Sequence, residues 1–315
     1  HIGASIGISL FPVGGVTLDA MIKNADIAMY RVKNSGKNGY AIFSHDMTTP
    51  ATERLMLEQE LRRALESDEF QIVYQPQVAT DTEALVGVEA LIRWNHPTRG
   101  LLAPGEFIPV AEDSRLIIDL DRLTLARACR EIAHYHRNGI PELRLAVNLS
   151  PLAVEKADFV ERVLATLAEE NFPPHLLELE ITESLLMSDR DDVVEKLEQL
   201  SAAGVHFAID DFGTGYSSLS YLRKFPVATL KIDRSFVNSI RAAAREEACI
   251  VDAIISMAQG LKLNIVAEGV ENRTQFNYLR SLGCDMVQGY LFGQPTSMSH
   301  LLQQRLTVAD SAAAT

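Results

Sequence analysis

Carboxylate and amide side chains stand at the ends of a series of short apolar segments in this sequence. They are, in chain order, Glu89, Asn148, Glu180, Glu183, Asp210, Asp211, Glu268 and Gln288, with Lys231 as a cation among them. So many carboxylates gathered in one place would repel one another and raise each other's pKa values. Hard divalent cations relieve that repulsion, and oxygen ligands of this kind are those that Mg²⁺ and Mn²⁺ prefer. The pattern therefore predicts a divalent-metal site, with two ions if the reaction is cleavage of a phosphodiester.

The adjacent acids Asp210 and Asp211 begin a run that continues Phe-Gly-Thr-Gly-Tyr-Ser-Ser to Ser218. Its glycines and small hydroxyl residues predict a loop whose backbone can approach a ligand closely. An ordinary turn from strand to helix, with an aspartate as helix cap, would explain the glycines. It would not explain the doubled aspartate, so we expect both acids to belong to the site.

The elements expected to position these side chains alternate between strand and helix. Eight strands are predicted, over Gln71–Gln77, Val86–Ile92, Arg144–Leu149, Leu176–Thr182, His206–Asp210, Ala228–Ile232, Leu263–Ala267 and Met286–Tyr290. Such alternation predicts an α/β fold, a TIM-like (β/α)8 barrel whose catalytic groups lie at the C-terminal ends of the strands. The stretch between the first two strands, about Ala79–Ala84, is too short for a parallel crossover. We therefore expect an irregular barrel with one antiparallel strand.

Charge and composition limit the classes of partner. A net charge of −13 argues against DNA or RNA polymers and against an anionic membrane surface. One small anionic ligand, neutralised by metal ions, is compatible with it. The three scattered cysteines, Cys129, Cys249 and Cys284, are too few for a disulfide framework or a zinc site. They favour a reducing compartment, so we expect a cytoplasmic location.

The first 45 residues differ from the rest. A strand over Ala4–Phe11, a helix over Leu18–Asn34 and a strand over Tyr40–Phe43 are predicted, which is too little core to fold alone. The expected organisation is a small α+β segment over 1–45, a linker over 46–56, the barrel over 57–303 and a flexible tail over 304–315. Because the chain starts with His1 rather than Met, we expect a longer protein with sensory domains upstream, which could anchor it to a membrane.

Nine ordered motifs resemble the EAL family of cyclic di-GMP phosphodiesterases. Glu89-Ala90-Leu91 resembles the motif that names the family, and Ile92-Arg93-Trp94 follows it. The others are Tyr74-Gln75-Pro76, Phe107-Ile108-Pro109, Val147-Asn148-Leu149-Ser150, Glu180-Ile181-Thr182-Glu183, the Asp210-Asp211 loop, Lys231-Ile232-Asp233, Ala267-Glu268-Gly269-Val270-Glu271 and Gln288-Gly289-Tyr290. The resemblance spans about Leu57 to Leu301.

The resemblance implies a barrel that hydrolyses cyclic di-GMP to linear pGpG with Mg²⁺ or Mn²⁺, using two ions. The metal ligands it implies are Glu89, Asn148, Glu180, Asp210 and Asp211. The catalytic residues it implies are Lys231, which positions the attacking water, Glu268, which supports that water or its metal ions, and Glu89. The substrate contacts it implies are Arg93, Gln75, Gln288 and Asp233. Glu183 is expected to anchor the loop that follows Asp211.

The first 45 residues resemble the C-terminal end of a GGDEF domain. The resemblance rests on Ser5-Ile6-Gly7-Ile8, on Ala25-Asp26-Ile27-Ala28-Met29-Tyr30 and on the Lys33–Gly39 turn. The motif that gives cyclase activity would lie upstream, so we expect no synthesis of cyclic di-GMP by this chain. One departure from the EAL pattern is Arg115, where the family often has Gly. It puts surface or dimer contacts in doubt rather than catalysis.

Two other functions stay open at this point. The first is a catalytically silent EAL domain that binds cyclic di-GMP as a receptor, although such relatives usually lose metal ligands that this sequence keeps. The second is a barrel enzyme of another class, such as a lyase acting on an enolate, which would leave Arg93 and the doubled aspartate unexplained. The expected partners are cyclic di-GMP and, by analogy with related domains, a second copy in a homodimer.

Overall fold

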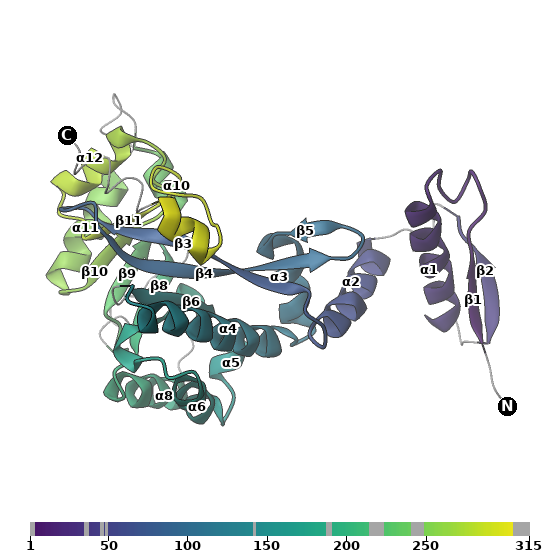
Figure 1. Ribbon diagram of the computed structural model, residues 1–315, viewed down its shortest axis with the longest axis horizontal. Helices are drawn as coiled ribbons and strands as arrows, with labels where there is room; N and C mark the ends of the chain where they lie inside the picture. Colours follow the sequence, from purple (N-terminus) through teal and green to yellow (C-terminus); the bar gives the residue numbers. More distant parts are fainter. Residues whose placement is uncertain are drawn as a thin grey trace. The chain divides into compact units, whose positions relative to one another are not determined.

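The structure is a computed structural model that describes residues 4–34, 38–44, 47, 50–140, 143–186, 191–213, 224–240 and 249–304. Its residues form two compact units: one comprises His1–Phe70 and Trp94–Leu116, the other Gln71–Arg93 and Ile117–Thr315. Figure 1 shows the elements of both. The residues 35–37 of the predicted turn, 214–218 of the aspartate loop and 305–315 of the predicted tail lie outside the described residues.

The strands follow the predicted order closely. They are β1 (Ser5–Ile8), β2 (Gly39–Ile42), β3 (Phe70–Ala79), β4 (Leu85–His96), β5 (Gly100–Leu102), β6 (Arg144–Leu149), β7 (Leu177–Thr182), β8 (His206–Phe212), β9 (Thr229–Ile232), β10 (Asn264–Ala267) and β11 (Met286–Gln288). Each predicted barrel strand is present, with ends that differ by a few residues. The short strand β5, which pairs antiparallel with the outer end of β4, was not predicted.

The helices lie mostly between these strands, as the alternating pattern predicts. Those with defined bounds in the described residues are α1 (Leu18–Asn34), α2 (Pro50–Ala64), α3 (Pro104–Asp113), α4 (Ile117–Arg137), α5 (Pro151–Val154), α6 (Phe159–Glu169), α7 (Glu183–Leu186), α8 (Asp191–Ala202), α10 (Arg234–Asn238), α11 (Cys249–Gly260) and α12 (Arg273–Ser281). A short 3₁₀ turn, η2 (Pro174–Leu176), precedes β7. In Figure 1, α4, α6 and α8 are drawn along the outer side of β6 to β8.

Eight strands close into a barrel. Their order is β3-β11-β10-β9-β8-β7-β6-β4, and a pairing between β3 and β4 closes the ring. All neighbours from β4 through β6 to β11 run parallel, whereas β3 pairs antiparallel with β11. The tight connection between β3 and β4 includes a hydrogen bond from Ala79 N to Ala84 O of 2.9 Å. The irregular (β/α)8 barrel with one antiparallel strand is therefore confirmed.

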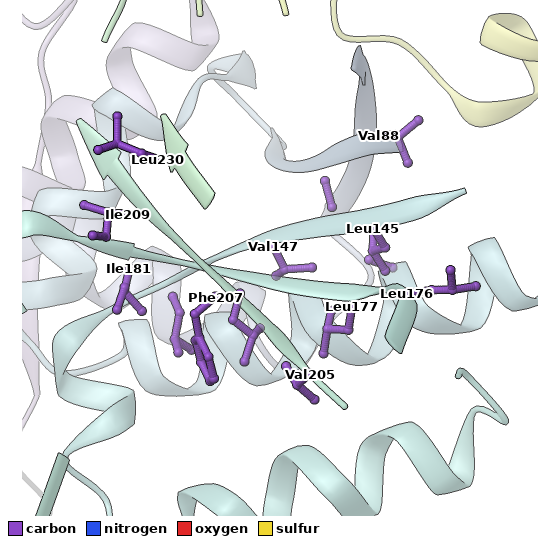
Figure 2. Packing of buried hydrophobic residues seen from close by; sticks show 14 of the residues in the cluster. Val88, Leu145, Val147, Leu176, Leu177, Ile181, Val205, Phe207, Ile209 and Leu230 are labelled. Atoms are coloured by element: carbon purple, nitrogen blue, oxygen red, sulfur yellow. The ribbon is translucent and has the colours of Figure 1, made fainter. Parts of the chain in front are cut away.

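Alternation along the strands separates an apolar outer layer from a polar interior. Successive side chains of a strand point to opposite faces. In β7, Leu177, Leu179 and Ile181 belong to the buried apolar core, while the intervening Glu178 and Glu180 face the other side. Figure 2 shows Leu177 and Ile181 among apolar residues of neighbouring strands. Burial of this outer layer under the helices stabilises the fold by about 25 cal/mol for each Å² of apolar surface removed from water. The alternate side chains of each strand then point into the barrel.

The N-terminal segment, residues 1–45, has little hydrophobic core of its own. Strands β1 and β2 pair in parallel on one side of α1. Among its described residues, the apolar side chains of Ile27 and Ala28 are fully buried and that of Phe43 is nearly so. By contrast, Phe11 and Val16 are 68% and 77% exposed. The predicted strand, helix and strand are confirmed, and so is the shortage of core.

The stretch expected to be a linker is partly helical. Helix α2 begins at Pro50, inside the predicted linker 46–56, because Pro is suited to a first helical turn. Its apolar residues Leu57 and Leu61 are four positions apart, which places them on one face of the helix, and both are buried. Among the described residues, no helix combines the length and the apolar character needed to cross a bilayer.

Candidate active site

The ammonium group of Lys231 lies at the centre of a cluster of carboxylates. Lys231 is on β9, in the barrel interior, and is 1% exposed. Its Nζ atom lies 2.6 Å from Glu268 Oε1, 2.7 Å from Glu180 Oε2, 3.2 Å from Asp210 Oδ1 and 3.9 Å from Glu89 Oε1. These residues come from five different strands or strand ends, so the closed barrel is what gathers them. The structure therefore brings together five residues that are far apart in the sequence.

Burial and mutual repulsion shift the protonation equilibria of this cluster. Burial raises the pKa of Glu180 well above its ordinary value, and Glu89 and Asp210 raise it further, while Lys231 opposes the shift. Burial also raises the pKa of Glu268, to about 7, against the lowering effect of Lys231. For Lys231 burial would lower the pKa, but the four carboxylates together raise it well above the usual value. Lys231 thus stays protonated. Its single positive charge compensates only part of the negative charge of the four carboxylates.

Glu89 is held by amide groups from two sides. Asn148 Nδ2 donates a hydrogen bond of 2.6 Å to Glu89 Oε1, and Gln288 Nε2 donates one to Glu89 Oε2. Gln288 Nε2 also donates to Gln75 Oε1, at 2.9 Å. Three residues expected to be ligands or substrate contacts are therefore bonded to one another or to Glu89. Asn148 is exposed at the end of β6, directly across from Glu180 in the register of β6 and β7.

The end of β8 carries the doubled aspartate. Asp210 lies beside Lys231, whereas Asp211 is exposed and has a left-handed backbone with φ of 52°. Although the residue as a whole is exposed, partial burial of its carboxyl group raises the pKa of Asp211, and the carboxylates of Asp210 and Asp233 raise it further. Burial opposes ionisation of Asp233, but hydrogen bonds from Ser235 outweigh it and hold the pKa of Asp233 below its usual value. Asp233 also caps α10, so it has a structural role beside any contact with substrate.

Glu183 bonds the start of the loop that follows β8. It is buried at the beginning of α7, and its Oε2 accepts a hydrogen bond of 3.1 Å from the backbone N–H of Gly213. Gly213 is the last described residue before the gap. This contact is what the anchoring role predicted for Glu183 requires.

Arg93 is a cation near the cluster that forms no ion pair with the described residues. It lies on β4, partly buried, and its Nη1 donates to the carbonyl of Ile92 at 2.8 Å. Burial lowers the pKa of its guanidinium, and the nearby Glu89 and Tyr290 oppose that effect. Its remaining donors can therefore bind an anion such as a phosphate.

The oxygen donors fit a hard divalent cation in kind, but they do not surround a metal position in this arrangement. Within the described ranges, no group of three or more His, Cys, Asp and Glu side chains is arranged to hold a metal ion, and Lys231 lies between the carboxylates instead. Glu180 Oε1, however, is buried and has no hydrogen-bond partner in the described part of the chain. A buried oxygen without a partner is costly, and a cation would satisfy it. The residues present therefore fit Mg²⁺ or Mn²⁺ by their chemistry.

Two polar residues of the barrel interior were missed by sequence reasoning. Gln77 is 2% exposed and donates to Gln288 Oε1 at 3.2 Å. Glu178 is 3% exposed and accepts a hydrogen bond of 2.6 Å from the hydroxyl of Thr229. Both lie at alternate positions from predicted site residues, Gln77 two after Gln75 and Glu178 two before Glu180. That two-residue period was the signal that could have found them.

Comparison with known proteins gives relatives over almost the whole chain. MucR of Pseudomonas aeruginosa, named a bifunctional diguanylate cyclase/cyclic di-GMP phosphodiesterase, is 45% identical over 302 residues, which cover 96% of this chain and 44% of MucR. NbdA of the same organism, named a cyclic di-GMP phosphodiesterase, is 44% identical over 298 residues, 95% of this chain and 38% of NbdA. The chain thus spans less than half the length of these two curated relatives.

Solved structures share the fold. The MucR phosphodiesterase in complex with c-di-GMP superposes with a TM-score of 0.74 at 44% identity, over 78% of this chain and 99% of that one. The EAL enzyme Bd1971, bound to cAMP and cyclic di-GMP, gives 0.76 at 29% identity, over 92% of this chain and 76% of that one. Residues 58–295 match the family model described as the EAL domain. With this match and the two relatives, the chain belongs to the EAL domain family.

Proposed function

We propose that this chain hydrolyses one phosphodiester bond of cyclic di-GMP and releases linear pGpG. The observation that carries the proposal is the cluster at the barrel mouth, where Lys231 lies within 4.0 Å of four carboxylates. The names of MucR and NbdA support the substrate. The expected metal ligands, the lysine and the cationic Arg93 are all present in one barrel, which favours a hydrolase over a silent receptor.

The proposed reaction is an attack of water on phosphorus. The water oxygen forms a new bond to phosphorus, and the bond from phosphorus to the 3′ oxygen breaks. The water loses a proton, and the departing 3′ oxygen gains one, so the product carries a terminal 5′ phosphate and a 3′ hydroxyl. Arg93 would bind the phosphate oxygens through two of its donors, while Gln75, Gln288 and Asp233 would line the substrate.

Lys231 and Glu268 would act on the water. The protonated Nζ of Lys231 would donate a hydrogen bond to the water oxygen and so fix its position. Glu268 has a pKa of about 7, which suits a group that accepts a proton near neutral pH. Its Oε1 lies 2.6 Å from Lys231 Nζ, so the two groups can reach the same water molecule.

Divalent metal ions would be held by oxygens of the cluster. The proposed ligands are Glu89, Asn148, Glu180, Asp210 and Asp211. Two bound Mg²⁺ or Mn²⁺ ions would lower the pKa of the attacking water and neutralise charge on the phosphate. The buried Glu180 Oε1, which lacks a hydrogen-bond partner among the described residues, supports this assignment.

For residues 1–45 we propose the C-terminal part of a GGDEF domain. The identity with MucR, a protein named for both cyclase and phosphodiesterase activity, covers 96% of this chain. It therefore extends beyond residues 58–295, which the EAL model matches. The small core around Ile27 and Phe43 is consistent with a piece of a larger domain.

The direct test is incubation of the purified chain with cyclic di-GMP in Mg²⁺, in Mn²⁺ and in EDTA, followed by identification of products. We expect pGpG with either metal and none in EDTA. Glu89→Ala should abolish turnover. Asp158→Asn, which removes the charge of one partner of the exposed ion pair with Arg162, is the control and should keep wild-type turnover. Binding of cyclic di-GMP without any product would instead establish the receptor function.

A further inference from the structure

Gln77 occupies an unusual position for a polar side chain. It lies on β3 and pairs in register with Gln288 of β11. Its side chain is 2% exposed, inside the barrel. A buried amide of this kind costs free energy unless its donors and acceptors are satisfied. Its partner in the structure is Gln288, to which its Nε2 donates a hydrogen bond of 3.2 Å.

The hydrogen bonds of Gln288 have a fixed polarity. Glu89 is acceptor-only when ionised, so the group that faces it must be the Gln288 NH₂. The same NH₂ donates to Gln75 Oε1 at 2.9 Å. The carbonyl Oε1 of Gln288 must then face the opposite way and needs a donor. Gln77 supplies that donor.

Space for this arrangement is left by Gly87 of β4. A Cβ atom added at Gly87 would lie 2.9 Å from Gln77 Oε1. That is closer than a side chain tolerates, so the glycine leaves room for the amide of Gln77. The Gln77 side chain is thus confined on one side by β4 and bonded on the other to Gln288.

We propose that Gln77 is a positioning residue that fixes the amide of Gln288 with its NH₂ toward Glu89 and thereby holds Glu89 in place as a metal ligand. The inference rests on the proposed metal-dependent function. Within the described part of the chain, the hydrogen bond of Gln77 goes to Gln288, so Gln77 would act on Glu89 through Gln288. Groups that orient a metal ligand in this way typically affect metal affinity or activity by about 10- to 100-fold.

Two substitutions separate the polarity of Gln77 from its size. Gln77→Met removes the donor and leaves Gln288 Oε1 unpaired, while Glu89 still favours the NH₂ of Gln288. Gln77→Glu has the same shape but only accepts hydrogen bonds when ionised. It would draw the Gln288 NH₂ away from Glu89 and turn a carbonyl oxygen toward that carboxylate. Gln77→Glu should therefore be the more damaging change.

The experiment is a calorimetric titration of each purified chain, residues 1–315, with Mn²⁺ alone, together with a melting curve in EDTA. We expect Mn²⁺ affinity to fall about 3-fold in Gln77→Met and at least 10-fold in Gln77→Glu. The control is Thr80→Val, which removes buried hydrogen bonds to Cys284 and Asp285 just beyond the end of β3. It should lower the melting temperature but leave Mn²⁺ affinity within twofold of wild type.

Each outcome supports or overturns the inference. Wild-type affinity in both Gln77 variants, or a loss in Gln77→Glu no larger than in Gln77→Met, overturns it while the proposed function stands. If Gln77→Glu does not fold, Gln77→Met decides, and unchanged Mn²⁺ affinity there overturns the inference. A wild-type chain that binds no Mn²⁺ overturns the metal-dependent function and this inference with it.

Discussion

Lys231 is a buried cation that serves two purposes in this account. It neutralises part of the charge of four carboxylates, and it is placed to hold the attacking water. Both purposes depend on the raised pKa that keeps it protonated. A buried charge without its partner is costly, so loss of the lysine would leave the carboxylates around it without a compensating charge.

Replacing Lys231 by Met should separate these purposes. We expect kcat for cyclic di-GMP to fall by about 10²- to 10⁴-fold, because the positioned donor is lost. The substrate should still bind within about tenfold of wild type, since Arg93 is unchanged. Steady-state kinetics and calorimetric binding with Ca²⁺ in place of Mg²⁺ give the two numbers. Turnover near the wild-type rate would remove Lys231 from the mechanism.

Glu180 should destabilise the metal-free protein at neutral pH. The pKa of Glu180 is higher in the folded state than in the unfolded chain, where it is about 4.3. The protonated side chain therefore contributes fully to the free energy of unfolding below that unfolded pKa. This contribution is lost as the pH rises through the folded-state pKa. Glu180→Gln removes this loss, and Lys231 keeps its contact with Glu268. In EDTA we expect the variant to be more stable than wild type by about 1 kcal/mol at pH 8, with a smaller difference at pH 5. Urea unfolding at both values tests this, and a difference that shrinks toward pH 8 would contradict it.

At the scale of elements, the sequence predicted the barrel well because its strand ends are marked by polar residues. The alternation in Leu177–Thr182 indicates both the strand and the face that carries Glu180. The two-residue period places Gln77 and Glu178 on the same strand faces as Gln75 and Glu180, but it does not say that their side chains are buried. Nothing local in the sequence tells whether a polar side chain on such a face meets a buried partner or solvent. Strand β5 was likewise missed, because three residues are too few for a period to show.

The turn after β10 places Glu268 and is tightly packed. Gly269 has φ of 67°, and a Cβ atom there would lie 2.5 Å from the Cβ of Arg234 in α10. Gly269→Ala should therefore cost about 1–3 kcal/mol of unfolding free energy and lower kcat by displacing Glu268. Gly105→Ala is the matched control, because a Cβ at Gly105 meets nothing within 4 Å. Urea unfolding and turnover of both variants test this; equal stability in the two would contradict the close packing.

At the scale of the whole molecule, the N-terminal segment and the barrel should differ in stability. The barrel has a large buried core, whereas β1, α1 and β2 bury few apolar side chains and expose many. We expect backbone amides of the described residues in 4–44 to exchange with solvent by local opening, at least 10²-fold faster than those of β7 and β8. Hydrogen exchange followed by mass spectrometry measures this. Protection of β1 and α1 equal to that of β7 would show that the segment shares the stability of the barrel.

The central claim is that the carboxylates and Lys231 at the barrel mouth direct one water molecule onto phosphorus. The most direct measurement is hydrolysis of cyclic di-GMP by the wild-type chain with Mn²⁺ in ¹⁸O-labelled water, with mass analysis of the product. The account predicts pGpG with one ¹⁸O atom in its terminal phosphate after a single turnover. Recovery of unchanged cyclic di-GMP, or a product whose phosphate contains no ¹⁸O, would contradict it.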